Sequence, residues 1–492
     1  MDRSAVIIGV GEASRKTVAG EYPSPVELAA QAVRAALADC GRGDAVSAAI
    51  DTLAAIRTFE DSGVSLGTGS PDNMPDAIAR ASGLSPAKLI YADVGGQSPQ
   101  AMINELASAI YDGAIDVAII AAGEAIGSGK RARKAGITLD WRQSSDRDFD
   151  NRLSAFPILD RREIRHGIVS MPIAYSLIEN SRRVRLGLEP GSYAREMAQL
   201  WSAFSKKSLD REHAQFPKVW SVEELLSDDN GNYQLTDIYR RWHVAQDAVD
   251  LGGAIILTSA SRARELGVSD DRFIWLAGAA QASEPPLSQR INLSGSDALD
   301  YAIKAALDQA GLAPSEVGPL DNYSCFPCAV FAAVDALGDS ARDYGDYTLT
   351  GGLSFFGGPG NGYSMYGLAA MVAKLRQDGS KPAMVTANGG VMSKQAVGIY
   401  TASKPARSLA GATAKGYVPQ TVDLNDVPEG NGRILTFVRP FRDGQAGPAT
   451  LFVELEDGSR TLAVMDQPPT GDIAGQTVEV GAGDKRHLAV LA

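Results

Sequence analysis

Short apolar runs alternate with amphipathic stretches along most of the chain. Runs with the composition of buried strands come first as AVIIGVG, LAAIR, LIYADV and VAIIAAGE, and later as FIWLAGAAQ, PLDNYSCF, TLTGGLSF, AMVTANGG and AVGIYTA. Strands that are apolar on both faces are typical of a parallel sheet covered by helices on both sides. The pattern therefore predicts an α/β fold.

The pattern also repeats once along the chain. The helix end VRAALADCG, closing at Gly41, matches IKAALDQAG, closing at Gly311. A second pair, IYDG before AIDVAIIAAGE and RQDG before SKPAMVTANGG, recurs after nearly the same interval. Glycine after an amphipathic helix is a common stop signal. Two such matches indicate a duplication into two packed α/β halves.

Two parts of the chain interrupt this repeat. Residues 125–250 mix helical stretches, such as MPIAYSLIENSRRVR and SYAREMAQLWSAFSKKS, with polar loops. Residues 405–492 begin as a linker and continue as short alternating segments joined by Gly and Asp turns, which predict a small β domain with an OB-like barrel. We therefore expect an N-terminal half over 1–265 that contains the insert, a C-terminal half over 266–404 and an extra domain over 405–492.

Composition narrows the class of protein. The formal net charge is −12, which disfavours generic nucleic-acid binding, and no apolar run of about 18 residues predicts a membrane span. Cys40, Cys325 and Cys328 are the only cysteines, and the N-terminus has no signal-peptide pattern. A cytoplasmic protein is the expectation.

Two turns that follow predicted strands carry candidate chemistry, since open sheets place their sites at such ends. In VGGQSPQ, Ser98 and Pro99 suit a helix start, and the backbone amides can also face an anion or a thioester oxygen. In DNYSCFPC, Cys325 and Cys328 have CxxC spacing, but zinc needs two further ligands that the sequence does not supply, so we expect no metal. Cys328 fits a buried hydrophobic position, which leaves Tyr323, Ser324 and Cys325 as candidates.

Two more segments join them. The loop GGLSFFGGPGNGY, from 351 to 363, is so rich in glycine that close approach of a ligand to its backbone is expected. In TANGG, Asn388 can donate to a developing oxyanion, or can simply serve the turn.

The insert also carries an excess of basic residues. Its sharpest piece is GKRARK, with Lys130, Arg131, Arg133 and Lys134. This piece is either a solvated loop or a site for the phosphates of a cofactor.

In this order and on a duplicated fold, these segments resemble the thiolase superfamily, most closely the sterol-carrier-protein-type thiolases and the mycobacterial thiolase-like proteins with an extra C-terminal domain. The resemblance spans residues 4–401, and the glycine loop is its most specific feature. It implies two βαβαβαββ halves in five layers, α-β-α-β-α. It also implies a pocket formed by Ser98, Ser324, Gly357, Pro359 and Tyr363.

Thiolase catalytic residues are nearly all missing. The nucleophilic cysteine falls on Gly96, the histidine of Gly-His-Pro falls on Gly358, and the second cysteine falls on Ala387. The His-Asp-Cys-Phe motif of the sterol-carrier branch appears as Tyr323-Ser324-Cys325-Phe326. Of the usual set, Cys325 alone remains, and covalent thiolysis needs both a thiolate and its activating base.

Three functions follow from the resemblance. The first is an acyl-CoA-binding, acetyl-CoA acetyltransferase-like protein of lipid metabolism that is not a standard thiolase. The second is an acyl-CoA retro-aldolase that uses Tyr323. Across these functions the candidate catalytic residues are Cys325, Tyr323 and Asn388. The third is a non-catalytic CoA-binding scaffold. In each case CoA or acyl-CoA is a ligand or substrate rather than a tightly bound cofactor, and thiolases lead us to expect a homodimer through the N-terminal half.

Overall fold

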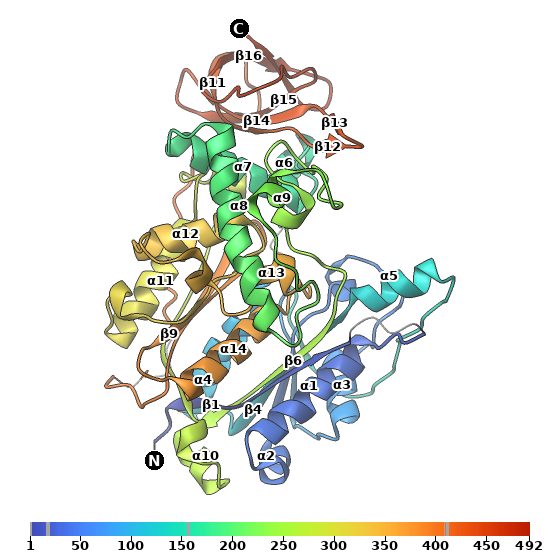
Figure 1. The fold of residues 1–492 in the computed structure, drawn as a ribbon, viewed down its shortest axis with the longest axis vertical. Helices are drawn as coiled ribbons and strands as arrows, with labels where there is room; N and C mark the ends of the chain where they lie inside the picture. Colours follow the sequence, from blue (N-terminus) through green and yellow to red (C-terminus); the bar gives the residue numbers. More distant parts are fainter. Residues whose placement is uncertain (1, 16–19, 155–157, 408, 410–412) are drawn as a thin grey trace.

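A computed structural model describes residues 2–15, 20–154, 158–407, 409 and 413–492 (Figure 1). One large sheet runs through the body in the order β5-β3-β2-β4-β6-β1-β7-β10-β9-β8. Its strands are β1 (Ala5–Ser14), β2 (Thr52–Ala55), β3 (Lys88–Tyr91), β4 (Val117–Ala125), β5 (Asp150–Asn151), β6 (Asp250–Ser259), β7 (Ile274–Ser283), β8 (Leu320–Asp321), β9 (Ala383–Gly389) and β10 (Lys394–Thr401).

The duplication is visible in the strand order. In the first half β1 pairs antiparallel with β6, β6 antiparallel with β4, and β4 parallel with β2. In the second half β7, β10, β9 and β8 repeat these relations, and β1 pairs with β7 where the halves meet. The predicted duplicated α/β body is confirmed. The expected parallel sheet is wrong, because β6 pairs antiparallel with β1 and β4, and likewise β10 with β7 and β9, which makes the sheet mixed.

Helices form the other layers. They are α1 (Pro25–Asp39), α2 (Gly43–Ala49), α3 (Met74–Ser82), α4 (Ser98–Asp112), α10 (Ala260–Glu265), α11 (Asp297–Ala310), α12 (Pro327–Leu337), α13 (Gly352–Phe355) and α14 (Ser364–Gln377). Helices α4 and α14 contact each other and strands of both halves, so they form the middle layer (Figure 1). α1 and α3 cover the first half from outside, and α11 covers the second, which completes the five layers.

Each half contains the same close contact between its first helix and its first strand. A side chain at Gly9 in β1 would place its Cβ 2.4 Å from the carbonyl oxygen of Ala36 in α1. At the equivalent position of the second half, a Cβ at Gly278 in β7 would lie 2.1 Å from the carbonyl oxygen of Ala306 in α11. Only glycine lets the first helix of each half lie this close to its strand.

One predicted strand is wrong. The segment TLTGGLSF at 348–355 forms no strand; it follows a short 3-10 turn and ends in α13. The carboxylate of Asp321 explains the difference, because its Oδ1 accepts the backbone N–H of Leu349 at 2.8 Å and that of Thr350 at 3.3 Å. These amides are thus satisfied by a side chain instead of a neighbouring strand.

The insert lies between β4 and β6. It contributes α5 (Ile126–Lys134), α6 (Arg161–Arg165), α7 (Met171–Arg185), α8 (Pro190–Lys207) and α9 (Val222–Leu226). Within it, β5 pairs with β3 and covers that edge of the sheet. This pairing occupies Ile90 and Tyr91 of β3, and a homodimer through this half stays a prediction.

The C-terminal region forms a closed barrel in the order β11-β14-β15-β17-β16. Its strands are β11 (Gly430–Val438), β14 (Ala449–Leu455), β15 (Arg460–Met465), β16 (Thr477–Ala482) and β17 (His487–Leu491), with a small hairpin of β12 (Phe441–Arg442) and β13 (Gln445–Ala446). The barrel has its own apolar core and packs on α7 of the insert (Figure 1). This agrees with the OB-like expectation.

Across the described residues, no helix is long and apolar enough to traverse a lipid bilayer.

Candidate functional site

The segments singled out in the sequence meet where α4 begins. The Ser364 hydroxyl, at the start of α14, donates to the carbonyl oxygen of Gly96 at 2.9 Å, and the N–H of Gly95 donates to Asn361 Oδ1 at 3.0 Å. A Cβ at Gly96 would lie 2.6 Å from the carbonyl oxygen of Asn388, at the end of β9. Strand ends of both halves thus build one site.

Tyr323 occupies the space in front of Gly96. A Cβ at Gly96 would lie 2.0 Å from the Tyr323 hydroxyl oxygen, closer than any real contact allows. The Tyr323 backbone N–H donates to Thr386 Oγ1 at 3.0 Å, and its ring packs edge-on against Tyr363 at 5.4 Å between centroids. The Tyr323 hydroxyl therefore stands where any side chain of residue 96 would be.

This hydroxyl keeps its proton at neutral pH. Burial raises the pKa of Tyr323 well above its usual range, and nearby Cys325 adds to the effect. Among the described residues, none forms a hydrogen bond with the hydroxyl. Tyr323 thus offers a neutral phenol O–H that is available to donate to a ligand.

Cys325 is not poised as a nucleophile. Burial raises the pKa of its thiol to about 12, although hydrogen bonds from neighbours partly offset the rise. The thiolate is the reactive form, and a pKa this high leaves almost none at neutral pH. The thiol lies 3.6 Å from Asn388 Nδ2, which is a weak contact and not an activating base.

Asn388 is already committed to its neighbours. Its Nδ2 donates to the Tyr175 hydroxyl oxygen at 3.0 Å as well as to the Cys325 sulfur. A carboxamide has two N–H donors, so both are engaged in this structure. Stabilising an oxyanion would require Asn388 to release one of these partners.

Tyr175 is a site residue that the sequence reasoning missed. It lies in α7 of the insert, its hydroxyl donates to the Gly390 carbonyl oxygen at 2.9 Å, and its ring stacks on Phe326 at 4.1 Å. The segment MPIAYSLIENSRRVR reads as an ordinary amphipathic helix, and nothing local separates Tyr175 from a core residue. Its place in the site depends on contacts with Gly390 and Asn388, which are distant in the sequence and belong to no recognisable motif with it.

Gly358 and Ala387, two positions expected to match thiolase catalytic residues, are small and buried. A Cβ at Gly358 would lie 3.2 Å from Ala245 Cβ and 3.4 Å from the Gln246 carbonyl oxygen, so a larger side chain would need its neighbours to shift. Ala387 is fully buried within β9.

The polar residues predicted to line the pocket mostly hold the loops in place. Ser98 does not cap α4; its hydroxyl donates to the Asp93 carbonyl oxygen, and Gln97 takes the cap position. Ser324 Oγ accepts the Leu353 N–H at 3.3 Å. Tyr363 shares a hydrogen bond with Thr350, and its buried hydroxyl has a raised pKa.

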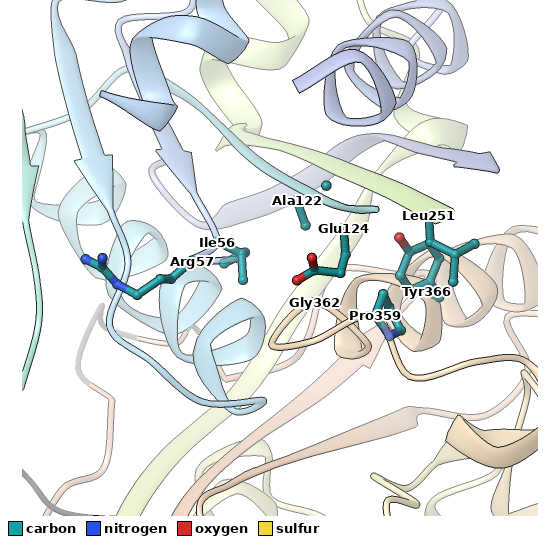
Figure 2. Close-up of a pocket in the computed structure, with 9 residues that line it drawn as sticks. Ile56, Arg57, Ala122, Glu124, Leu251, Pro359, Gly362 and Tyr366 are labelled. Carbon is teal, nitrogen blue, oxygen red and sulfur yellow. The ribbon is translucent and has the colours of Figure 1, made fainter. Parts of the chain in front are cut away.

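A second missed residue, Glu124, lies under the glycine loop. It lines a cavity of about 10 Å³, the size of one water, together with Pro359, Gly362 and Tyr366 (Figure 2). Burial raises the pKa of Glu124 to about 7, while the N–H of Phe59 donates to its Oε2 at 2.9 Å and limits the rise. A single acid at the end of the otherwise apolar VAIIAAGE was the available signal.

Three of the four basic residues predicted to meet phosphate are engaged within the chain. All four lie on α5, where Lys130 pairs with Asp247 at 2.6 Å and Arg131 pairs with buried Asp250 at 2.6 Å. Arg133 donates to a backbone carbonyl, and Lys134 is exposed at the helix end. The Lys130 pair is exposed and can open at little cost, whereas Arg131 is held in place.

Gly357, the glycine-loop residue predicted to line the pocket, lies close to Val249: a Cβ there would be 2.8 Å from Val249 Cγ1.

Comparison with known proteins identifies relatives of the whole chain. A monomeric SCP2-thiolase like protein type 1 from Mycobacterium smegmatis is 33% identical, with 100% of both chains covered and a TM-score of 0.83. The Ltp2–ChsH2(DUF35) aldolase is 18% identical over 81% of this chain and 98% of its own, with a TM-score of 0.58. An acetyl-CoA acetyltransferase from Syntrophomonas wolfei is 16% identical over 82% of this chain and 100% of its own, also with a TM-score of 0.58. These last two show the fold alone. No family model matches the chain, and no curated protein does.

The contact between Tyr323 and Gly96 predicts a coupled pair of substitutions. Gly96→Ala forces its Cβ against the phenol and is expected to lower the free energy of unfolding by about 2 to 3 kcal/mol. In the background of Tyr323→Ala, which costs about 3 kcal/mol by leaving a cavity, the same change should cost little. The four proteins of this double-mutant cycle can be compared by urea unfolding.

Gly191→Ala, at an open position of α8, is the matched control and is expected to be neutral or slightly stabilising. If the effects of Gly96→Ala and Tyr323→Ala on the free energy of unfolding add, the proposed contact between these two positions is contradicted, because substitutions of residues in contact should not be additive.

Proposed function

This chain belongs to the SCP2-thiolase-like proteins of the thiolase superfamily, and on that premise we propose that it binds an acyl-CoA thioester without forming an acyl-enzyme. The observation that carries the proposal is the Tyr323 hydroxyl, which fills the space of the missing nucleophile at Gly96. A bound thioester would meet a phenol O–H there instead of a thiolate.

The chemistry of the remaining groups supports binding without covalent transfer. Ping-pong acyl transfer needs an ionised nucleophile and a general base beside it. Here Cys325 is protonated, Gly358 offers no imidazole, and Ala387 offers no second thiol. Tyr323 can instead donate to the thioester carbonyl oxygen and polarise it.

The phosphates of CoA would bind near α5 in this proposal. Lys134 is exposed, and Lys130 could leave Asp247 for a phosphate, since both members of that pair are half-exposed. Arg131 would stay with Asp250 and brace the helix. CoA remains the expected ligand, and of the four basic residues predicted to bind its phosphates only Lys130 and Lys134 are proposed to do so.

Calorimetric titration with CoA and acetyl-CoA tests the proposal. We expect binding in the micromolar range, weakened about tenfold by Lys130→Ala together with Lys134→Ala, because two phosphate contacts are lost. Arg264→Ala, on α10 away from the insert, is the control and should leave binding unchanged. Absence of heat with every CoA species would contradict acyl-CoA binding altogether.

A second candidate function is a carbon–carbon lyase of the retro-aldol type. It is favoured by the unpartnered Tyr323 hydroxyl, and by the fused barrel in a chain whose fold is shared with an aldolase described together with a DUF35 partner. In a 3-hydroxyacyl thioester the bond between the α- and β-carbons would break, and its electron pair would pass to the thioester as an enolate. The phenol would deliver its proton to the α-carbon and regain one from the β-hydroxyl as the new carbonyl forms.

Tyr323→Phe separates this candidate from the others. Release of aldehyde or ketone from a panel of 3-hydroxyacyl-CoA thioesters, followed by mass spectrometry, should fall at least about 100-fold while CoA affinity stays within about threefold. Cys325→Ala should retain the lyase activity. Thiolysis that depends on Cys325 would instead revive the transferase, and silence of the whole panel with intact binding would leave the scaffold.

A further inference from the structure

The Tyr175 hydroxyl has every hydrogen-bonding position filled. It donates to the Gly390 carbonyl oxygen at 2.9 Å, and it accepts from Asn388 Nδ2 at 3.0 Å and from the Met392 N–H at 3.1 Å. A phenol hydroxyl has one donor and two acceptor positions, so no capacity remains for a substrate. Tyr175 is therefore suited to hold other groups in place and not to exchange protons.

Gly390 and Met392 belong to the turn between β9 and β10, and Asn388 lies just before that turn at the end of β9. Met392 adopts a left-handed backbone with φ of 51°, which is uncommon for a residue with a side chain. Such a conformation persists only where its surroundings determine it. The Tyr175 hydroxyl helps to hold Met392 in this conformation by accepting its N–H. The Arg290 guanidinium also donates a hydrogen bond to the Val391 carbonyl oxygen at 2.7 Å.

The same turn forms one wall of the site. The Asn388 carbonyl oxygen faces Gly96, next to the Tyr323 hydroxyl, and the Asn388 carboxamide reaches the Cys325 sulfur. A shift of the turn would move both groups. The hydroxyl of Tyr175 is thus placed to fix the shape of the site without contacting a ligand itself.

Helix α7 delivers Tyr175 because its other side is braced on the barrel. Thr436 in β11 donates to the Leu177 carbonyl oxygen at 2.8 Å, and Asn180 donates to the Phe437 carbonyl oxygen at 3.1 Å. One turn beyond Tyr175, the buried carboxylate of Glu179 accepts the Cys328 N–H at 2.8 Å, where α12 begins. α7 therefore connects the barrel to two segments of the site (Figure 1).

We propose that Tyr175 is a positioning residue of the thioester site: its hydroxyl fixes the β9–β10 turn and holds the Asn388 carboxamide against Cys325. This inference rests on the proposed function for its consequence, tighter binding of an acyl-CoA thioester. In this proposal the insert carries Tyr175 on α7, and the barrel holds α7 in place, so both help to fix the geometry of the site.

Tyr175→Phe tests the inference, with Tyr239→Phe as the matched control. Both tyrosines are buried beside the ring of Phe326, but the Tyr239 hydroxyl bonds Glu179 and does not reach the turn. We expect Tyr175→Phe to weaken acetyl-CoA binding about tenfold by calorimetry, as the loss of one well-formed interaction would, and Tyr239→Phe to change it less than about twofold. Equal weakening in both would reduce Tyr175 to a structural role and overturn the proposal.

A second readout does not depend on CoA binding. A small methanethiosulfonate reagent labels the thiolate of Cys325, which both Tyr175 and the Asn388 N–H stabilise. The labelling rate, with the site located by peptide mass and followed across alkaline pH, reports that thiolate. Tyr175→Phe removes the hydroxyl's own effect on Cys325 and frees the Asn388 N–H, so labelling should slow several-fold, whereas Tyr239→Phe should leave the rate unchanged. Faster labelling in Tyr175→Phe would indicate general loosening and contradict the proposal. If the unsubstituted protein binds no CoA, the proposed function fails, but the labelling result still decides the role of Tyr175.

Discussion

At the start of α4 a phenol hydroxyl faces an α-carbon that carries no side chain, and the remaining features of the site follow from that contact. The Tyr323 hydroxyl oxygen lies so close to Gly96 that the two positions cannot both hold large groups. The tyrosine after β8 and the glycine before α4 therefore depend on each other, although they come from opposite halves of the molecule. The site therefore has a neutral hydrogen-bond donor where a side chain of residue 96 would lie.

Protonation of the site agrees with this change of chemistry. Burial raises the pKa of the Cys325 thiol to about 12 and also raises the pKa of Tyr323 above its usual range, so both groups carry protons at neutral pH. A pocket that generates a nucleophile needs the opposite shift. The contacts of Asn388 with Tyr175 and with Cys325 then join the insert to the second half beside Gly96.

The sequence predicts the parts of this structure that depend on local pattern. The two helix ends at Gly41 and Gly311 reveal the duplication, and alternating short segments reveal the barrel. The strand expected at 348–355 fails because Asp321, distant in sequence, captures its backbone amides. Tyr175 and Glu124 were missed for a similar reason: each has a helix or strand setting that explains it locally, while its role depends on contacts formed only by the tertiary fold. The closeness of the Tyr323 hydroxyl to Gly96 is likewise a distance in space, although the glycine at position 96 is visible in the sequence.

The central claim is that a thioester bound here stays non-covalent, and intact-protein mass spectrometry tests it most directly. The protein is incubated with excess acetyl-CoA and quenched in acid, so that any acyl-enzyme is retained. The account predicts the mass of the unmodified chain at every time point. A rapidly formed acetyl adduct on Cys325 would contradict it, because that residue would then be acting as the nucleophile that the buried, protonated thiol is argued not to be.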